Sequence, residues 1–259
     1  MPHALQALPP ALLAAVVLGA FTVMTTLGAL SGFAAERLVP GRRIFAVPLF
    51  EGQYRFELLG NAVFLAIATA AVTLALHTGA IRFAAAGLAR DGLTFVAMLW
   101  GFQVFYWFLH RAMHTRRLVA IHRWHHRSHT TTPLTGQSMS APEAALWMLG
   151  YVGLPIVLSW VAPLGFWGWA GYLAFNVYGN VMGHANVEVT VEAGATRPAS
   201  LFANAFVFHA LHHARWTGHY GFQGAGMDRL MGTEWDDWPA LYKRIISGSP
   251  MDSYKTRGW

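Results

Sequence analysis

The sequence predicts an all-α integral membrane protein with four to five transmembrane helices and a cytoplasmic helical cap that carries a histidine-rich di-metal site. Composition is the first reason: 55% of the residues are hydrophobic and 12% are charged, about half the charged fraction usual in a soluble domain. The apolar residues also lie in long uncharged runs, as bilayer-spanning helices require. Finally, most of the histidines gather where those runs end.

The first expected span runs from Pro9 to Gly32. No Asp, Glu, Lys or Arg occurs before Glu36, and the paired prolines suit the first turn of a helix. No basic segment precedes this run and no convincing cleavage site follows it, so we expect an uncleaved anchor rather than a signal peptide. A second span is expected over about 58–76. Together with their loops, these helices form the N-terminal part, 1–92, of one expected membrane domain.

The rest of that domain, 93–259, is expected to hold a third span, a helical hairpin and a C-terminal cap. The third span covers 92–109, which is uncharged from Gly92 to Leu109. The hairpin is expected over 144–182, because the 44 residues between Glu143 and Glu188 carry no charge. One helix of that length would be about twice as long as the hydrocarbon core is thick.

A break within the hairpin is expected at "APLGFWG", residues 162–168. Its two helices would then cover about 144–161 and 165–182. With five crossings, every Lys and Arg except Arg82 and Arg90 falls on one face of the membrane. The positive-inside tendency makes that face cytoplasmic, and a bacterial inner membrane suits the Ala-, Gly- and Arg-rich composition better than the endoplasmic reticulum. A pI near 10.0 therefore needs no nucleic acid to explain it.

Three histidine motifs fall on the same expected face as the arginines. They are "HRAMH" (His110, His114), "HRWHH" (His122, His125, His126) and "HALHH" (His209, His212, His213). Spacings of three and four place side chains on one face of a helix, so we expect each motif to aim its imidazoles in a single direction. Neutral imidazole binds iron, zinc, copper and nickel. Eight such ligands, with His184 nearby, exceed the four of a tetrahedral zinc site and suit two metal ions.

The three motifs, their order and their place around a late hydrophobic hairpin resemble the fatty acid hydroxylase/sterol desaturase superfamily of integral-membrane di-iron oxygenases. The resemblance covers roughly 93–235. "GHANVEV" (183–189) resembles the family's isolated His-Asn segment, and "HYGFQGAGMDRLMGT" (219–233) resembles its Asn-Tyr-Gly … Trp-Asp-Arg-Leu-Phe-Gly-Thr ending. The resemblance implies metal-ligand roles for His110, His114, His122, His125, His126, His184, His209, His212 and His213.

Four further residues are candidates at this site. His219 stands where many family members have Asn, so it is either an added ligand or a hydrogen-bonding substitute. His129 is a ligand, a donor to a ligand, or a surface group. Asn186 and Asp228 are candidate acceptors for the second N–H of a metal-bound imidazole. Apolar residues that could line a lipid path are Phe102, Phe105, Trp147, Met148, Phe175 and Met182.

The resemblance implies an enzyme that hydroxylates a C–H bond of a lipid, whether fatty acyl, membrane lipid, sterol-like or carotenoid. It would use O₂ and two iron ions without haem, and zinc could substitute for iron. The chain has no cysteine, which excludes thiolate-bound iron–sulfur clusters. A separate ferredoxin- or cytochrome b5-type system would therefore supply the electrons.

Desaturation by the same site and a bis-histidine haem protein are alternatives to hydroxylation. A zinc protease is disfavoured because the sequence contains no HExxH motif. A metal transporter is disfavoured because it would place its ligands within the spans.

Overall fold

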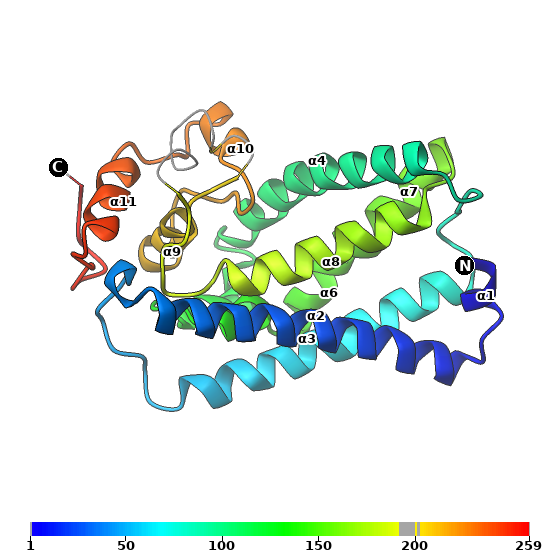
Figure 1. Ribbon diagram of the computed structural model, residues 1–259, viewed down its shortest axis with the longest axis horizontal. Coiled ribbons are helices and arrows are strands. Elements are labelled where there is room, and N and C mark those ends of the chain that lie inside the picture. Colours follow the sequence, from blue (N-terminus) through cyan, green and yellow to red (C-terminus); the bar gives the residue numbers. More distant parts are fainter. Residues whose placement is uncertain (1, 192–199, 201–202, 259) are drawn as a thin grey trace.

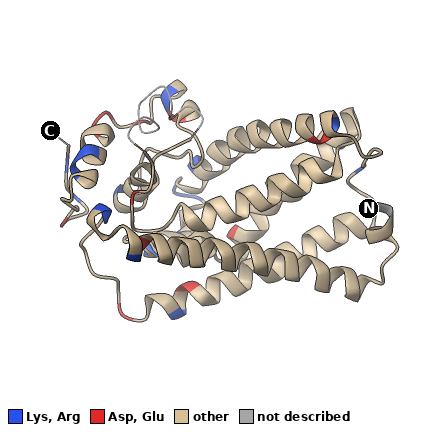
Figure 2. Ribbon diagram, viewed as in Figure 1, with Lys and Arg blue, Asp and Glu red and all other residues tan. Residues whose placement is uncertain are grey.

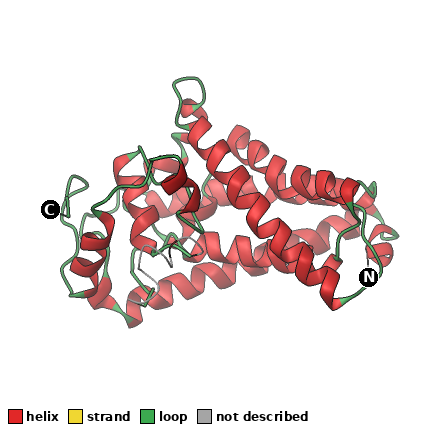
Figure 3. Ribbon diagram, turned by 90° about the horizontal axis from the view of Figure 1, so that it is seen from above, coloured by secondary structure: helices red, strands yellow, loops and turns green. Residues whose placement is uncertain are grey.

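The computed structural model describes residues 2–191, 200 and 203–258, which form helices and loops without a β-strand (Figures 1 and 3). A short helix, α1 (Pro2–Gln6), leads into a bundle. The bundle consists of α2 (Pro10–Leu38), α3 (Gln53–His77), α4 (Leu88–Met113), α6 (Ala141–Met148), η4 (Leu149–Gly153), α7 (Leu154–Val161) and α8 (Phe166–Met182). The predicted all-α class is confirmed.

Four segments of the described chain are long and apolar enough to cross a membrane: Pro10–Leu38, Gln53–His77, Leu88–Met113 and Ala141–Val161. The predicted hairpin is present, because α6, η4 and α7 run to Val161 and α8 returns from Phe166. At 17 residues, α8 is shorter than these four segments. It nevertheless packs along α2 and α4 inside the bundle.

The first arm of the hairpin is not a uniform α-helix, since residues Leu149–Gly153 form one π-helical segment. Such segments re-aim the side chains around them and are frequent at functional sites. Here Gly150 lies against the rings of Phe102 and Phe105, where a Cβ atom would collide. The segment therefore brings α4 and the hairpin close together, beside Trp147 and Tyr151.

A cap of shorter helices covers one end of the bundle (Figure 1). Its elements are η1 (Pro40–Arg42), α5 (Val119–His122), η2 (His125–Arg127), η3 (Pro133–Gln137), α9 (Phe206–Arg215), α10 (Gly226–Leu230) and α11 (Trp238–Ile246). The cap has its own core, in which Phe208 and Leu211 of α9 pack against Trp238 and Leu241 of α11. One face of α9 is thereby fixed to the cap.

Charged side chains gather at the capped end, and the bundle helices carry few of them along their length (Figure 2). The opposite end has only a small group, which includes Arg90 and Asp91. The N-terminal helices and the histidine-bearing region form one packed bundle, because α2 packs on α8 and α3 packs on α6. This arrangement leaves an apolar middle between two polar ends.

Candidate metal centre

Nine histidines meet at the junction of the bundle and the cap, and they form two groups. The first group is His110, His114, His122, His126 and His212, and the second is His125, His184, His209 and His213. Within each group, one ring nitrogen per residue lies within 4.8 Å of the corresponding nitrogen of every other member. All nine are buried except His114, which is half-buried. The histidines expected from the sequence are therefore brought together.

Each of the two longer motifs is divided between the groups. In "HALHH", His209 and His213 belong to the second group, whereas His212 belongs to the first. Adjacent helical residues project about 100° apart, so one turn of α9 can serve two centres. In "HRWHH", His125 alone belongs to the second group. The expectation that each motif aims in one direction holds for "HRAMH", whose two histidines share the first group, and is wrong for the two longer motifs.

The local backbone explains the division of "HRWHH". The helix α5 ends at His122, and the chain resumes as a separate 3₁₀ turn at His125. The remaining members come from helix ends, because His110 lies in the last turn of α4, His114 is its C-cap and His184 follows α8. Each long motif thus ties the two groups to one another.

Six of the nine imidazoles have a fixed outer nitrogen. The Nδ1 atoms donate to the carbonyls of Tyr220 (from His110, 2.7 Å), Ser138 (His125, 3.3 Å), Asn180 (His184, 2.6 Å), Gly218 (His212, 2.8 Å) and Ser128 (His213, 3.1 Å), and to Glu143 Oε1 (His122, 2.7 Å). A hydrogen bond of this kind fixes the tautomer and the ring orientation of a metal-binding histidine. Nε2 is left as the inward-facing atom.

Inward-facing nitrogens approach one another closely. The Nε2 atoms of His110 and His122 are 3.1 Å apart, those of His126 and His212 are 3.0 Å apart, and those of His184 and His209 are 3.0 Å apart. His110 and His122 both carry their proton on Nδ1, so two lone pairs face each other. Nitrogens bound to one ion at about 2.1 Å lie about 3 Å apart when the bonds are perpendicular. The arrangement fits a shared cation.

The charge state of the rings favours the same interpretation. Burial lowers the pKa of His125 to about 4 and the pKa of His184 to about 3. Desolvation disfavours the charged imidazolium, so these rings are neutral near pH 7. A neutral ring offers a lone pair to a metal. The donor set therefore fits two transition-metal ions, one in each group.

Two buried carboxylates support the site and were not among the residues expected from the sequence. Glu143 accepts the His122 proton on Oε1, while its Oε2 atom has no hydrogen-bond partner in the described chain. Glu57 in α3 accepts the hydroxyl protons of Ser128, Thr132 and Thr135. It thereby fixes the loop whose Ser128 carbonyl holds His213. The sequence did offer a signal for these two residues, because both acids lie at the edge of an apolar span or inside it. Charged side chains there cost free energy and are usually functional.

Asp228 supports the candidate ligand His110 indirectly, through the main chain of Tyr220. Its carboxylate accepts the main-chain N–H groups of Tyr220 and Gly221 and the indole N–H of Trp107. The Tyr220 carbonyl in turn accepts the His110 proton. Asn186 instead pairs with both main-chain groups of Phe45, and its side chain bonds to none of the nine imidazoles. It connects the segment after α8 to the loop before α3.

His219 and His129 lie outside both groups. His219 donates from Nδ1 to the Phe208 carbonyl at 2.9 Å, and its Nε2 accepts the N–H of Trp235 at 3.0 Å. Both nitrogens are occupied, and the ring stacks on Phe208. His219 thus holds the turn that presents the Gly218 carbonyl to His212. His129 donates from Nδ1 to the His213 carbonyl and lies beside Tyr254.

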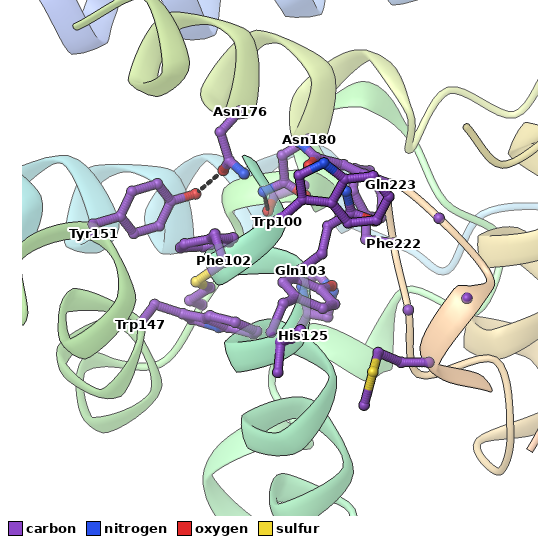
Figure 4. A pocket seen from close by; sticks show the side chains of 18 of the residues that line it. Trp100, Phe102, Gln103, His125, Trp147, Tyr151, Asn176, Asn180, Phe222 and Gln223 are labelled. Carbon is purple, nitrogen blue, oxygen red and sulfur yellow. Dashed lines mark hydrogen bonds between the residues drawn. The ribbon is translucent and has the colours of Figure 1, made fainter. Parts of the chain in front are cut away.

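A cavity of about 120 Å³ opens beside the two groups, between α4, α6, α8 and the loop at 221–227 (Figure 4). His122 and His125 line it, so one member of each group reaches it. Of the residues expected to line a lipid path, Phe102 and Trp147 do so. Phe175 lines a neighbouring cavity, beside His209. Phe105, Met148 and Met182 line neither of these cavities.

The segment that carries the nine histidines also matches a known protein family. The model of the fatty acid hydroxylase family matches residues 95–233, more than half of the chain. Very-long-chain aldehyde decarbonylase GL1-4 of Oryza sativa subsp. indica is 26% identical over 184 residues, which are 70% of this chain and 26% of the rice protein. Protein CER1-like 2 of Arabidopsis thaliana is 31% identical over 166 residues, 60% of this chain and 26% of that protein.

A third relative, very-long-chain aldehyde decarbonylase CER1 of Arabidopsis thaliana, is 24% identical over 147 residues. These residues are 55% of this chain and 23% of that protein. The chain thus spans about a quarter of the length of these curated relatives. No solved structure matches the chain.

Proposed function

The chain belongs to the fatty acid hydroxylase family, and we propose that it is a membrane-bound di-iron oxygenase that hydroxylates a C–H bond of a lipid. The observation that carries this proposal is the pair of histidine groups whose inward nitrogens face one another beside an apolar cavity. The nine grouped imidazoles would hold two iron ions, five ligands on one and four on the other. Zinc could replace iron in the same nitrogen sites.

Two iron ions would supply the activation of O₂, with one oxygen atom entering the C–H bond and the other leaving as water. This balance requires two electrons and two protons. The chain has no cysteine for an iron–sulfur cluster, so a separate ferredoxin- or cytochrome b5-type donor would supply the electrons. Glu143 lies beside His122 with Oε2 free in the cavity lining, where it could hold a proton.

The remaining residues of the site bind the substrate and keep water out. Phe102, Tyr106 and Trp147 pack together along the cavity, so a lipid chain would lie against aromatic rings rather than solvent. The names of the curated relatives, very-long-chain aldehyde decarbonylases, support a lipid substrate. We propose a bacterial inner membrane with the centre at its cytoplasmic face, supported by the basic residues at the capped end (Figure 2).

The haem alternative conflicts with the packing of the rings. Nε2 atoms 3.0–3.1 Å apart leave no room for a porphyrin between the paired histidines. Desaturation would use the same site, since the same oxidant can remove a second hydrogen.

Lipid extracts from cells with and without the gene separate the two reactions. Hydroxylation predicts a product heavier by one oxygen atom, and desaturation predicts one lighter by two hydrogen atoms. Identical extracts under conditions in which the iron-loaded protein accumulates would contradict both.

A further inference from the structure

The cavity beside the histidine groups contains an amide with no partner. Gln223 lines this cavity, and both its amide nitrogen and its amide oxygen are buried without a hydrogen-bond partner in the described chain. Buried polar atoms in native proteins are nearly always paired. A side chain with two unpaired atoms facing a cavity therefore indicates a bound polar group. Figure 4 labels Gln223 and Asn180 among the side chains that line the cavity.

Two further oxygens without a hydrogen bond to the described residues belong to side chains that line the same space. Asn180 donates its amide N–H to the Gly136 carbonyl at 2.6 Å, and its Oδ1 atom accepts no hydrogen bond from the described residues. Glu143 contributes its free Oε2 atom. Both residues touch the metal centre directly, because the Asn180 carbonyl accepts from His184 and Glu143 accepts from His122. Asn180 and Glu143 thus add polar groups at the histidine end of the cavity, whose lining also includes Gln103 and the hydrogen-bonded pair of Tyr151 and Asn176.

The other lining residues are largely apolar, and none of them is Lys or Arg. An ionised carboxylate or phosphate would find no cationic side chain there, and its only counter-charge would be the proposed iron ions, where it would compete with O₂. On the outer side of α4, Trp100 is 44% exposed and Val104 is 43% exposed. Both line the cavity, so a long apolar chain could extend from it towards the bilayer. The cavity therefore suits a neutral head group on an apolar body.

The balance of donors and acceptors selects among neutral head groups. The Gln223 amide offers two N–H groups and one acceptor oxygen, Asn180 adds an acceptor, and Glu143 Oε2 accepts when ionised and donates when protonated. An ester or aldehyde carbonyl can only accept hydrogen bonds, so it would leave all of these acceptor oxygens unpaired, whereas the single proton of a hydroxyl would pair one of them. A hydroxyl group both donates and accepts. We propose that the cavity binds the hydroxyl end of a neutral lipid alcohol, with its oxygen held between Gln223 and Asn180.

This proposal rests on the proposed oxygenase function and adds a position of attack. The hydroxyl-binding groups and His122 and His125 line one cavity of about 120 Å³, so the carbon attacked lies within a few bonds of the hydroxyl. The remote end of the chain lies away from the metal centre.

Binding can be measured without turnover. Iron-loaded protein in phosphatidylcholine nanodiscs would be incubated with radiolabelled hexadecanol, and the label retained above empty nanodiscs would be counted. We expect unlabelled hexadecanol to displace the label about tenfold more effectively than hexadecanoate or hexadecane at the same mole fraction. Equal displacement by hexadecanoate or by hexadecane would overturn the proposal.

Two variants test the assigned residue. Gln223→Leu, or the closer isostere Gln223→Met if the first misfolds, should bind hexadecanol about tenfold more weakly with unchanged iron content. Gln6→Met replaces a glutamine outside the cavity and should bind normally. Undiminished binding by correctly folded Gln223→Met would refute the role of this residue. If the protein bound hexadecanol but could not be loaded with iron, the oxygenase proposal would be contradicted and the hydroxyl site would still stand.

Discussion

At the scale of single residues, the orientation of each imidazole depends on what its Nδ1 atom contacts. Five of the six fixed rings donate to main-chain carbonyls, and only His122 donates to a carboxylate. A carboxylate makes the ring a more basic ligand than a carbonyl does. Glu143 therefore acts on the first group through His122, as a positioning residue.

For the ligands themselves, we predict that His125→Ala or His212→Ala abolishes turnover while the protein still inserts in membranes. Each substitution removes one inward nitrogen from a different group. Metal analysis of the wild-type chain should find about two iron ions and no haem absorption, and each variant should bind less iron. His77→Ala, at an exposed site outside both groups, is the matched control. Full activity in either ligand variant would rule out its assigned role.

The Glu143→Gln substitution should weaken iron binding by about 10- to 100-fold, because the glutamine amide oxygen is a weaker acceptor of the His122 proton than a carboxyl group that can ionise. The change keeps the side-chain shape, so membrane insertion should be normal. The effect is measured as the amount of iron that the protein retains as the chelator concentration is raised. Asp252→Asn, an exposed acid outside the site, should not change the series. A wild-type chelator profile for Glu143→Gln would mean that Glu143 only fills space.

Stability of the metal-free protein should fall as the pH drops below about 6.5. The unfolded histidines titrate there, whereas burial lowers the folded pKa of His125 to about 4 and that of His184 to about 3. The unfolded chain therefore binds more protons in this window, and stability is lost until the folded pKa is reached. Thermal unfolding in detergent between pH 8 and pH 5 would measure the slope. His125→Asn should flatten the slope, and a slope unaffected by this change would contradict the assignment.

At the scale of elements, α3 contributes a buried acid to a loop that is distant in sequence. Glu57 accepts the hydroxyl protons of Ser128, Thr132 and Thr135 and an amide proton of Gln53. These four donors belong to the loop after "HRWHH" and to α3 itself. The loop therefore takes its shape from the second bundle helix, and its Ser128 carbonyl then fixes His213.

Replacing Glu57 with Ala should destabilise the protein by about 3 kcal/mol or more, because several buried donors would lose one acceptor. Unfolding of the metal-free protein isolates this effect from metal loss. Glu51→Ala removes an exposed acid just before the same helix and should cost little. Comparable stability of the two variants would show that the loop does not depend on Glu57.

The helical hairpin and eight of the nine grouped histidines could be predicted from the sequence because both leave local patterns, an uncharged run with a Pro/Gly break and spacings of three and four. His184 has no such spacing and was expected from the resemblance of "GHANVEV" to the family's His-Asn segment. The division of the histidines into groups could not. It depends on the backbone leaving α5 at His122 and resuming at His125, which residue spacing does not encode. Gln223 was missed for a related reason, since an amide shows itself as unpaired only after the cavity around it has formed.

At the scale of the whole molecule, the uneven charge distribution predicts how the protein sits in the membrane. The capped end holds most of the Lys and Arg residues (Figure 2), and such residues favour the cytoplasmic side. The chain has no cysteine, so single cysteines report orientation without background. Ser249→Cys near the cap and Ala86→Cys in the loop before α4 are both exposed. With the capped end in the cytoplasm, an impermeant maleimide should label Ala86→Cys in intact spheroplasts and Ser249→Cys only in inverted vesicles. This orientation places the histidine centre on the side of the membrane that supplies electrons. The reverse pattern would place the centre outside and require an extracytoplasmic electron donor.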